Sequence, residues 1–269
     1  MASQKDRLTQ FRALHGKGEF LVLPNSWDAA SARMAEEAGA KALASSSAAV
    51  AWCHGYPDGE GMPRDVVLTS VREITRVTTL PLTVDSEAGY SSNLREVAAH
   101  VMTLIDMGVA GINIEDGTEP ASLLADKIRA IKMAAKEKGA DIFINARADV
   151  YLKNLVPDDK KLAEIISRGK LYREAGADGF FAPAVNGIAH VREIVSAVDL
   201  PVNILFMRAT PSLSELKAAG VRRVSVGALI GRAAYGYAVH ATKLLLDEGK
   251  PDAIFATSND CPDFNKLFG

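Results

Sequence analysis

One structural unit recurs along the chain: a helix that ends at a glycine and is followed at once by an apolar strand. The unit is written EEAGAKAL, IDMGVAGI, REAGADGF and KAAGVRRV at successive points of the sequence. Glycine is common just past a helix C-terminus because it adopts the left-handed backbone conformation without steric cost. Strands that alternate with helices in this way are typical of a parallel sheet. The sequence therefore predicts an α/β fold.

Eight strand-then-helix units can be read between residues 20 and 248. The expected strands are short apolar runs that follow a glycine, a proline or a helix end. They are 20–23, 41–45, 82–84, a run ending at Glu115, a run ending at Asn145, 178–182, LPVNILF and RRVSVGAL. Eight such units typically need about 250 residues, and the chain has 269. We expect one (β/α)₈ barrel domain over residues 1–269, with a lead-in helix at 5–17 and the last twenty residues as a tail.

Composition gives no reason to expect nucleic acid or a membrane as a partner. The net charge is −2 and the isoelectric point is about 6.2, so no basic surface is indicated. The N-terminal stretch has no apolar core of a signal peptide, and no run of 18 apolar residues occurs. The two cysteines, Cys53 and Cys261, form no metal-like pair. Their low number fits the reducing cytoplasm, where we expect the protein to reside.

Charged side chains gather where three of the expected strands end. Asp85 and Glu87 follow the strand at 82–84, Glu115 ends the next strand, and Arg147 follows the one after it. In a (β/α)₈ barrel these ends meet at the C-terminal face, where active sites lie. Carboxylate oxygens are ligands that suit Mg²⁺. A solvated acidic turn remains the alternative for each stretch alone, but the recurrence favours one shared site.

Several of these stretches resemble motifs of the isocitrate lyase/phosphoenolpyruvate mutase superfamily. They are, in chain order, LPNSWDAASARMAEEAG, SSSAAVAWCHGYPDGE, VDSEAGY, GINIED, INARAD and RRVSVGALIGRAAYG. The likeness runs from about residue 20 to residue 240 and lies at matching strand ends. The resemblance implies a (β/α)₈ barrel. It also implies the chemistry of the superfamily, in which the enolate of pyruvate or of a related 2-oxo acid forms while its oxygens chelate Mg²⁺.

The resemblance further implies a metal site and an anion grip. Asp85 would be the Mg²⁺ ligand, directly or through water, and would lie against the substrate. Glu87 and Glu115 would hold metal-bound waters. Arg147 would bind a substrate carboxylate, for which its planar fork is suited.

The same resemblance assigns the remaining substrate contacts. Ser46, Ser47 and Ala48 would offer hydroxyl and backbone N–H groups to the substrate, and Trp27 would form an apolar wall. Asp58 would lie beside the reacting group. Asp58, Glu115 and Arg147 are therefore the candidate catalytic residues.

Departures from the family pattern narrow the expected activity. After the fourth strand the lyases carry a K-(K/R)-C-G-H loop and the phosphonomutases a K-x-N-S lid, whereas this chain reads GTEPASLLADK. The dedicated cysteine acid and the lid are both missing. Glu87 also replaces the usual second aspartate, and Ser47 a usual glycine. The longer carboxylate of Glu87 still reaches a water-mediated position.

We expect a Mg²⁺-dependent lyase or decarboxylase that cleaves a C–C bond of a small 2-oxo or 2-hydroxy carboxylic acid. One alternative is P–C chemistry, as in phosphoenolpyruvate mutase or phosphonopyruvate hydrolase. Another is a barrel that binds a 2-oxo acid without turnover. The family commonly forms dimers or tetramers by exchanging the eighth helix, so we expect a homodimer or homotetramer. Residues 236–247 are apolar enough for exchange, although the same stretch could cover its own barrel.

Overall fold

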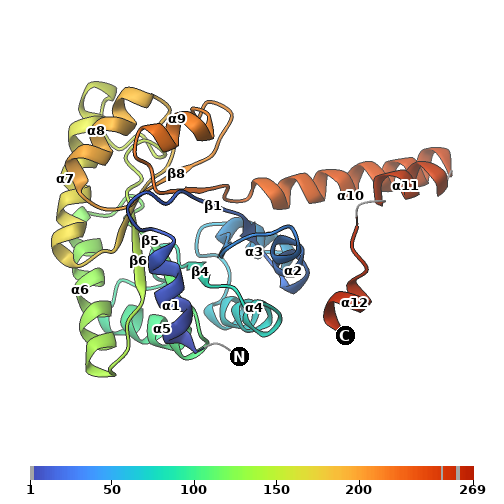
Figure 1. Ribbon diagram of the computed structural model, residues 1–269, viewed down its shortest axis with the longest axis horizontal. Coiled ribbons are helices and arrows are strands. Elements are labelled where there is room, and N and C mark those ends of the chain that lie inside the picture. Colours follow the sequence, from blue (N-terminus) through green and yellow to red (C-terminus); the bar gives the residue numbers. More distant parts are fainter. Residues whose placement is uncertain (1–2, 250, 259–260) are drawn as a thin grey trace.

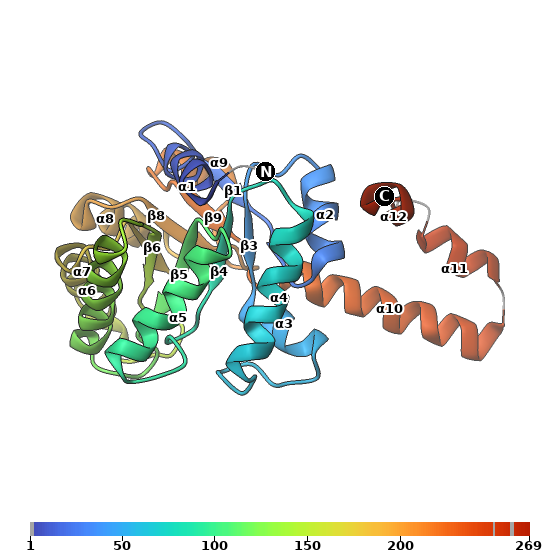
Figure 2. The ribbon, with the colours of Figure 1, turned by 90° about the horizontal axis from the view of Figure 1, so that it is seen from below.

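The computed structural model describes residues 3–249, 251–258 and 261–269, and a closed ring of parallel strands forms its centre (Figures 1 and 2). The strands are β1 (Leu21–Leu23), β2 (Asn25–Ser26), β3 (Leu43–Ser45), β4 (Leu82–Asp85), β5 (Gly111–Glu115), β6 (Phe143–Arg147), β7 (Gly179–Ala182), β8 (Val202–Leu205) and β9 (Arg223–Ser225). Their order is β1-β9-β8-β7-β6-β5-β4-β3-β2. β1 and β2 are two halves of one strand, separated by Pro24; β1 pairs with β9 and β2 pairs with β3. The ring therefore closes as an eight-stranded barrel. The predicted (β/α)₈ barrel is confirmed.

The helices follow the predicted order, with three additions. They are α1 (Gln4–Ala13), α2 (Ala29–Glu37), α3 (Ser47–Cys53), α4 (Arg64–Val77), α5 (Leu94–Asp106), α6 (Ala121–Glu137), α7 (Asp158–Ala175), α8 (Ile188–Val198), α9 (Leu213–Ala218), α10 (Leu229–Glu248), α11 (Pro251–Ser258) and α12 (Phe264–Phe268). The added helices are α11 and α12, which lie in or next to the expected tail, and α3, which directly follows the strand expected at 41–45. Helix α3 forms because the side chain of Ser46 caps it, accepting a hydrogen bond from the backbone N–H of Ala49. The strand expected to end at Asn145 continues to Arg147.

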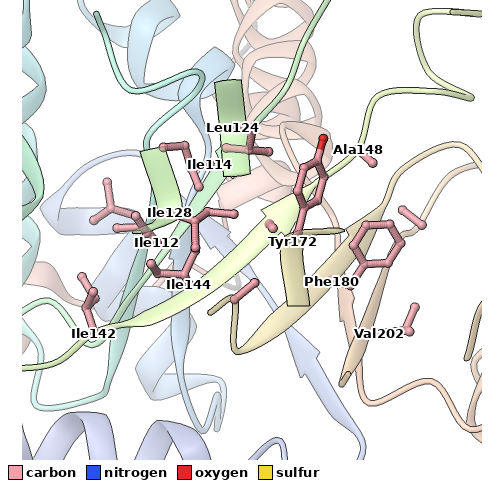
Figure 3. Close-up of a cluster of buried hydrophobic side chains, with 14 of the residues drawn as sticks. Ile112, Ile114, Leu124, Ile128, Ile142, Ile144, Ala148, Tyr172, Phe180 and Val202 are labelled. Atoms are coloured by element: carbon pink, nitrogen blue, oxygen red, sulfur yellow. The ribbon is translucent and has the colours of Figure 1, made fainter. Parts of the chain in front are cut away.

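Alternation along each strand separates a helix-facing core from the barrel interior. On β5, Ile112 and Ile114 are fully buried among apolar side chains of α6, including Leu124 and Ile128 (Figure 3). The residues between them, such as Asn113, take the other face of the strand. Burying a large aliphatic side chain contributes about 1.5–3 kcal/mol. This outer core holds the strand ends at fixed positions.

The N-terminal helix α1 closes one end of the barrel. Leu8 and Phe11 pack against Leu21, Leu23 and other apolar residues at the N-terminal ends of the strands. The opposite end, at the C-terminal ends of the strands, holds a cavity.

Helices α10 to α12 project away from the barrel (Figures 1 and 2). Apolar side chains on this arm are exposed, including Tyr237 (63%), Leu246 (77%) and Phe255 (67%). Exchange of α10 between subunits stays a prediction. Within the described part of the chain, no helix combines the length and apolar character needed to cross a membrane.

His15 is a buried titratable group beneath the barrel interior. Its Nδ1 atom lies 2.8 Å from the carbonyl oxygen of Phe11, and its Nε2 atom has no hydrogen-bond partner. Because Nδ1 must donate to that carbonyl, Nε2 is left as the unprotonated nitrogen of the neutral ring. Burial, with a smaller contribution from nearby Arg223, lowers the pKa of His15 from 6.5 to about 3. The folded state therefore holds His15 neutral.

Stability should fall as the pH drops below about 6.5, because the unfolded chain binds a proton at His15 and the folded chain resists it until about pH 3. Between pH 7.5 and 5 this residue alone should remove about 2 kcal/mol from the free energy of unfolding. His100, whose pKa burial lowers to about 4, adds to the drop.

Urea unfolding at the two pH values tests this expectation. The variant His15→Leu should lose less stability over that interval than the natural chain, and the exposed-site control His240→Asn should lose as much. Equal losses in all three proteins would contradict a neutral buried His15.

Candidate active site

A cavity of about 160 Å³ opens at the C-terminal ends of the strands and brings together most of the predicted site residues. Those that line it are Ser46, Ser47, Ala48, Asp58, Asp85 and Arg147. They come from separate stretches of the chain: the β3–α3 junction, the loop before α4, and the ends of β4 and β6. They meet because neighbouring parallel strands end at the same rim. The predicted shared site is therefore geometrically possible.

Asp85 offers an oxygen that no described group satisfies. Its Oδ2 atom accepts a long hydrogen bond, 3.4 Å, from the backbone N–H of Ser47, whereas Oδ1 is buried without any partner. Burial raises the pKa of Asp85, and the nearby Arg147 opposes that rise. A buried carboxylate oxygen without a donor is costly unless a cation reaches it. This oxygen is a fitting ligand for a metal ion.

Arg147 is held in place by two carboxylates. Its Nε and Nη2 atoms donate to Asp149 at 2.6 and 3.1 Å, and Nη1 lies 2.5 Å from Glu115. Asp149 is fixed in turn, because its backbone N–H donates to Asp116. Burial alone would lower the pKa of Arg147, but Glu115 and Asp149 outweigh it and raise the pKa. Asp149 therefore orients Arg147.

Glu87 is fixed by the loop that carries Asp58. Its carboxylate accepts from the backbone N–H of Glu60 and from the hydroxyl of Tyr90, and the N–H of Tyr90 donates to the carboxylate of Glu60. All three residues have positive φ angles, 46° at Glu87, 58° at Tyr90 and 62° at Glu60. Such backbone costs of order 1–3 kcal/mol per residue and persists only where surrounding contacts enforce it. These hydrogen bonds between the two loops supply that constraint.

The acids at this rim crowd one another. Burial raises the pKa of Glu87 to about 7, and repulsion from Asp85 and Asp58 adds to the rise. Burial raises the pKa of Glu115 to about 8 despite its ion pair with Arg147. Glu87 and Glu115 line a second cavity of about 410 Å³ rather than the first. A cation bound close to Glu87 and Glu115 would lower their pKa values and so stabilise their ionised forms.

Two of the implied roles have less geometric support. Among the described residues no group of three or more His, Cys, Asp or Glu side chains is gathered closely enough to hold a metal ion. Asp85 is the better placed ligand, and direct coordination by Glu87 or Glu115 as well is not supported by their present positions.

Trp27 is buried against Ala49 and Val50 and lines a separate groove near α10. Its role as a wall of the substrate site stays a prediction.

Asn113 is a cavity residue that sequence reasoning missed. It lines the 160 Å³ cavity, and its Oδ1 atom accepts from Asn145 at 2.9 Å and from Arg223 at 3.2 Å. Because a guanidinium can only donate, the side-chain atom that faces Arg223 must be the oxygen. The amide nitrogen of Asn113 is thereby left as a donor, in a residue that lines the same cavity as Asp85 and Arg147. An isolated asparagine within an apolar strand carries no motif, so only the strand register reveals it.

The variant Asn113→Asp should weaken binding of oxalate in the presence of Mg²⁺ by about tenfold or more, because a carboxylate oxygen replaces a donor beside the anion. The substituted side chain still accepts from Asn145 and Arg223, so the barrel should stay folded, with a lower free energy of unfolding because the second carboxylate oxygen has no donor and lies on the strand next to Asp85. Isothermal titration calorimetry and urea unfolding measure the two quantities.

A matched control is Asn203→Asp. Asn203 is a buried interior residue that exchanges hydrogen bonds with Ser225 and does not line the cavity. Oxalate affinity that falls equally in both variants would show a general effect of charge, and unchanged affinity in Asn113→Asp would place the amide nitrogen away from the anion.

Known proteins share this chain's sequence pattern over most of its length. The family model for phosphoenolpyruvate phosphomutase matches residues 11–246. The 2-methylisocitrate lyase of Escherichia coli is 32% identical over 263 residues, which cover 92% of this chain and 87% of the lyase. The oxaloacetate decarboxylase of Marinomonas sp. is 30% identical over 250 residues, which cover 89% of this chain and 84% of the decarboxylase.

Solved structures share the barrel. A candidate phosphonomutase from Burkholderia cenocepacia J2315 superimposes with a TM-score of 0.84 at 39% identity, covering 88% of this chain and 99% of its own. A phosphonopyruvate hydrolase, crystallised with oxalate and Mg²⁺, gives a TM-score of 0.84 at 22% identity, covering 100% of this chain and 95% of its own. That second likeness concerns the fold alone. The named relatives thus include enzymes of C–C bonds and of P–C bonds.

Proposed function

We propose, because this chain belongs to the phosphoenolpyruvate mutase/isocitrate lyase superfamily, that it is a Mg²⁺-dependent lyase or decarboxylase. Its substrate would be a small 2-oxo or 2-hydroxy carboxylic acid, cleaved at a C–C bond. The observation that carries this proposal is the unpartnered Oδ1 of Asp85, which lines one cavity together with Arg147. A cation site and an anion grip in one small cavity fit a chelating 2-oxo acid.

The residues present fit a magnesium ion. Mg²⁺ is usually held by one or two carboxylates and keeps several waters, and Asp85 supplies one buried oxygen in need of a cation. Glu87 and Glu115 would take metal-bound waters rather than the ion itself. When bound, Mg²⁺ would polarise the oxygen at C2 of the substrate and stabilise the negative charge that develops there.

The chain's own groups would bind and orient the acid. Nη1 and Nη2 of Arg147 each carry a second N–H beyond those engaged with Glu115 and Asp149, and these can donate to the C1 carboxylate. In the first turn of α3 the backbone N–H groups of Ser47 and Ala49 already donate to Asp85 and Ser46, which leaves the N–H of Ala48 to donate to the acid. Binding in this way fixes the bond to be broken relative to Asp58.

Bond cleavage would then leave its electron pair on the substrate. In a 2-oxo acid the bond between C3 and C4 would break, the electron pair would form an enolate across C2 and C3, and C4 would leave as CO₂ or as a carbonyl compound. For a carbonyl fragment, Asp58 would accept the hydroxyl proton that is lost. The enolate carbon finally takes a proton, which gives the 2-oxo acid product. Preorganised charge at such a site is commonly the largest contribution to rate.

The short loop after β5 favours this activity over P–C chemistry. Only Asp116 to Pro120 separate β5 from α6, too few residues for a lid that would exclude water from a transferred phosphoryl group. Phosphonomutase, phosphonopyruvate hydrolase and non-catalytic binding are the alternatives that the experiment below separates.

The protein is incubated with Mg²⁺ and, in turn, with oxaloacetate, 2-methylisocitrate and phosphonopyruvate, and products are followed by ¹H and ³¹P NMR. We expect C–C cleavage of a carboxylic acid and no release of phosphate. Asp85→Ala should lower the rate about 10²–10³-fold and should abolish the rise in melting temperature that oxalate with Mg²⁺ gives the natural chain.

The matched control is Asp106→Ala, an exposed carboxylate at the end of α5. Phosphate release from phosphonopyruvate would overturn the C–C assignment. An Asp85→Ala variant that keeps full activity and the full Mg²⁺ effect would overturn the metal assignment, and tight oxalate binding without any product over hours would favour a binding protein.

We further propose a cytoplasmic homodimer or homotetramer. Both cysteines are free, which fits a reducing compartment. The exposed apolar side chains of α10 and α11, with Leu246 and Phe255 among them, fit burial against a second subunit. Light scattering that gives the mass of a single chain would contradict this assembly.

A further inference from the structure

The rim of the barrel is divided into a polar half and an apolar half. Going round the cavity, β4, β5 and β6 contribute Asp85, Asn113 and Arg147, whereas β7 and β8 contribute Phe181 and Leu205. The polar lining resumes at β9 and β2 with Ser225 and Asn25. Two residues from the loops after β6 and β7 extend the apolar half, namely Leu152 and Pro183. Phe181 also lies under the guanidinium of Arg147, 5.8 Å from ring centre to Cζ. A bound acid would therefore have its carboxylate at one side of the cavity and carbon at the other.

The apolar half offers no cation for a second carboxylate. Arg147 is the sole lysine or arginine among the described residues that line this cavity, and its guanidinium already faces Glu115 and Asp149. Lys153 lies over the neighbouring 410 Å³ cavity, 3.4 Å from Asp149 and 3.9 Å from Glu115. Arg208, in the loop after β8, is exposed and does not line the cavity. A second negative charge would lose hydration there without gaining a partner.

The size of the cavity limits what fits beside the chelating atoms. Its volume of about 160 Å³ is below the roughly 300–1,000 Å³ of pockets for drug-sized ligands. Leu205 is closely packed against the backbone of Gly227, because a Cβ atom placed on Gly227 would lie 3.2 Å from the Cδ1 atom of Leu205. The apolar half therefore suits a short or branched alkyl group.

We propose that the substrate is a 2-oxo acid with a single carboxylate, whose C4 carries a hydroxyl group, as the cleavage to a carbonyl compound requires, and an uncharged alkyl group packed against Phe181, Leu205, Leu152 and Pro183. This inference rests on the proposed function, since the 2-oxo acid end is placed by Asp85 and Arg147. It departs from the dicarboxylates and tricarboxylates that the proposed activity would otherwise allow.

Binding of a matched pair of acids tests the inference. 4-Methyl-2-oxopentanoate and freshly dissolved oxaloacetate differ in that an isopropyl group replaces a carboxylate of similar shape, and both are compared with pyruvate. Apparent dissociation constants are measured in the presence of Mg²⁺ by displacement of oxalate. The alkyl acid should bind about tenfold more tightly than pyruvate, because burial of the isopropyl group removes apolar surface from water. Oxaloacetate should bind no more tightly than pyruvate.

The variant Leu205→Ala distinguishes a direct contact between Leu205 and the alkyl group from a role of Leu205 in shaping the whole site. It should reduce the advantage of the alkyl acid over pyruvate severalfold while leaving oxalate, which does not extend to the apolar half, at its natural affinity. The control Leu213→Ala, an exposed leucine on α9 outside the cavity, should change neither.

Tighter binding of oxaloacetate than of the alkyl acid would overturn the inference and leave the proposed function standing. Loss of oxalate affinity in Leu205→Ala equal to the loss for the alkyl acid would also overturn it, as it would show a structural role for Leu205. If oxalate fails to bind with Mg²⁺ at all, the proposed function fails and this inference with it.

Discussion

The unpartnered oxygen of Asp85 is the constraint around which the open end of the barrel is arranged. Packing gives no reason to place a carboxylate there, since an apolar side chain would fill the position without the cost of burying charge. The oxygen is buried, receives no hydrogen bond, and lies among further acids whose pKa values burial raises. A site that is destabilised in this way when empty becomes favourable when a cation enters. We read this arrangement as a metal site prepared by the fold.

Closure of the sheet is what brings the participating groups to one rim. Strands β4, β5 and β6 are adjacent, and Asp85, Glu115 and Arg147 each lie at the C-terminal end of one of them. The break of the first strand at Pro24 lets β1 pair with β9 and β2 with β3, which completes the ring. Helix α1 fills the other end with Phe11 and its neighbours. The C-terminal rim therefore stays open while the rest of the barrel is packed.

Much of the barrel was predictable because local signals and tertiary structure agree. Glycine C-caps and apolar runs indicated the eight strands of the barrel, and the motifs indicated five residues besides Arg147 that line the 160 Å³ cavity. The position of Trp27 was not predictable, because its strand end faces both the cavity and the groove near α10. The role of Asn113 required the register of three strands. The backbone of Glu87 required knowledge of how the Asp58 loop folds back, which no local pattern encodes.

The division of the rim into polar and apolar halves was also beyond sequence reasoning. Phe181 and Leu205 read as ordinary strand residues, and only closure of the barrel turns them toward the same cavity as Arg147. Lys153 lines the 410 Å³ cavity, although its chain neighbour Leu152 lines the 160 Å³ cavity. The side chains that meet at this rim are those at the C-terminal ends of the strands, whatever their distance along the chain.

Crystals grown with oxalate and Mn²⁺, a substitute for Mg²⁺ with anomalous scattering, give the most direct test. The account predicts an anomalous peak about 2.1–2.2 Å from Oδ1 of Asp85, close to the distances that Mg²⁺ demands, with oxalate between the ion and Arg147. A peak elsewhere, or oxalate bound without any ion near Asp85, would contradict it.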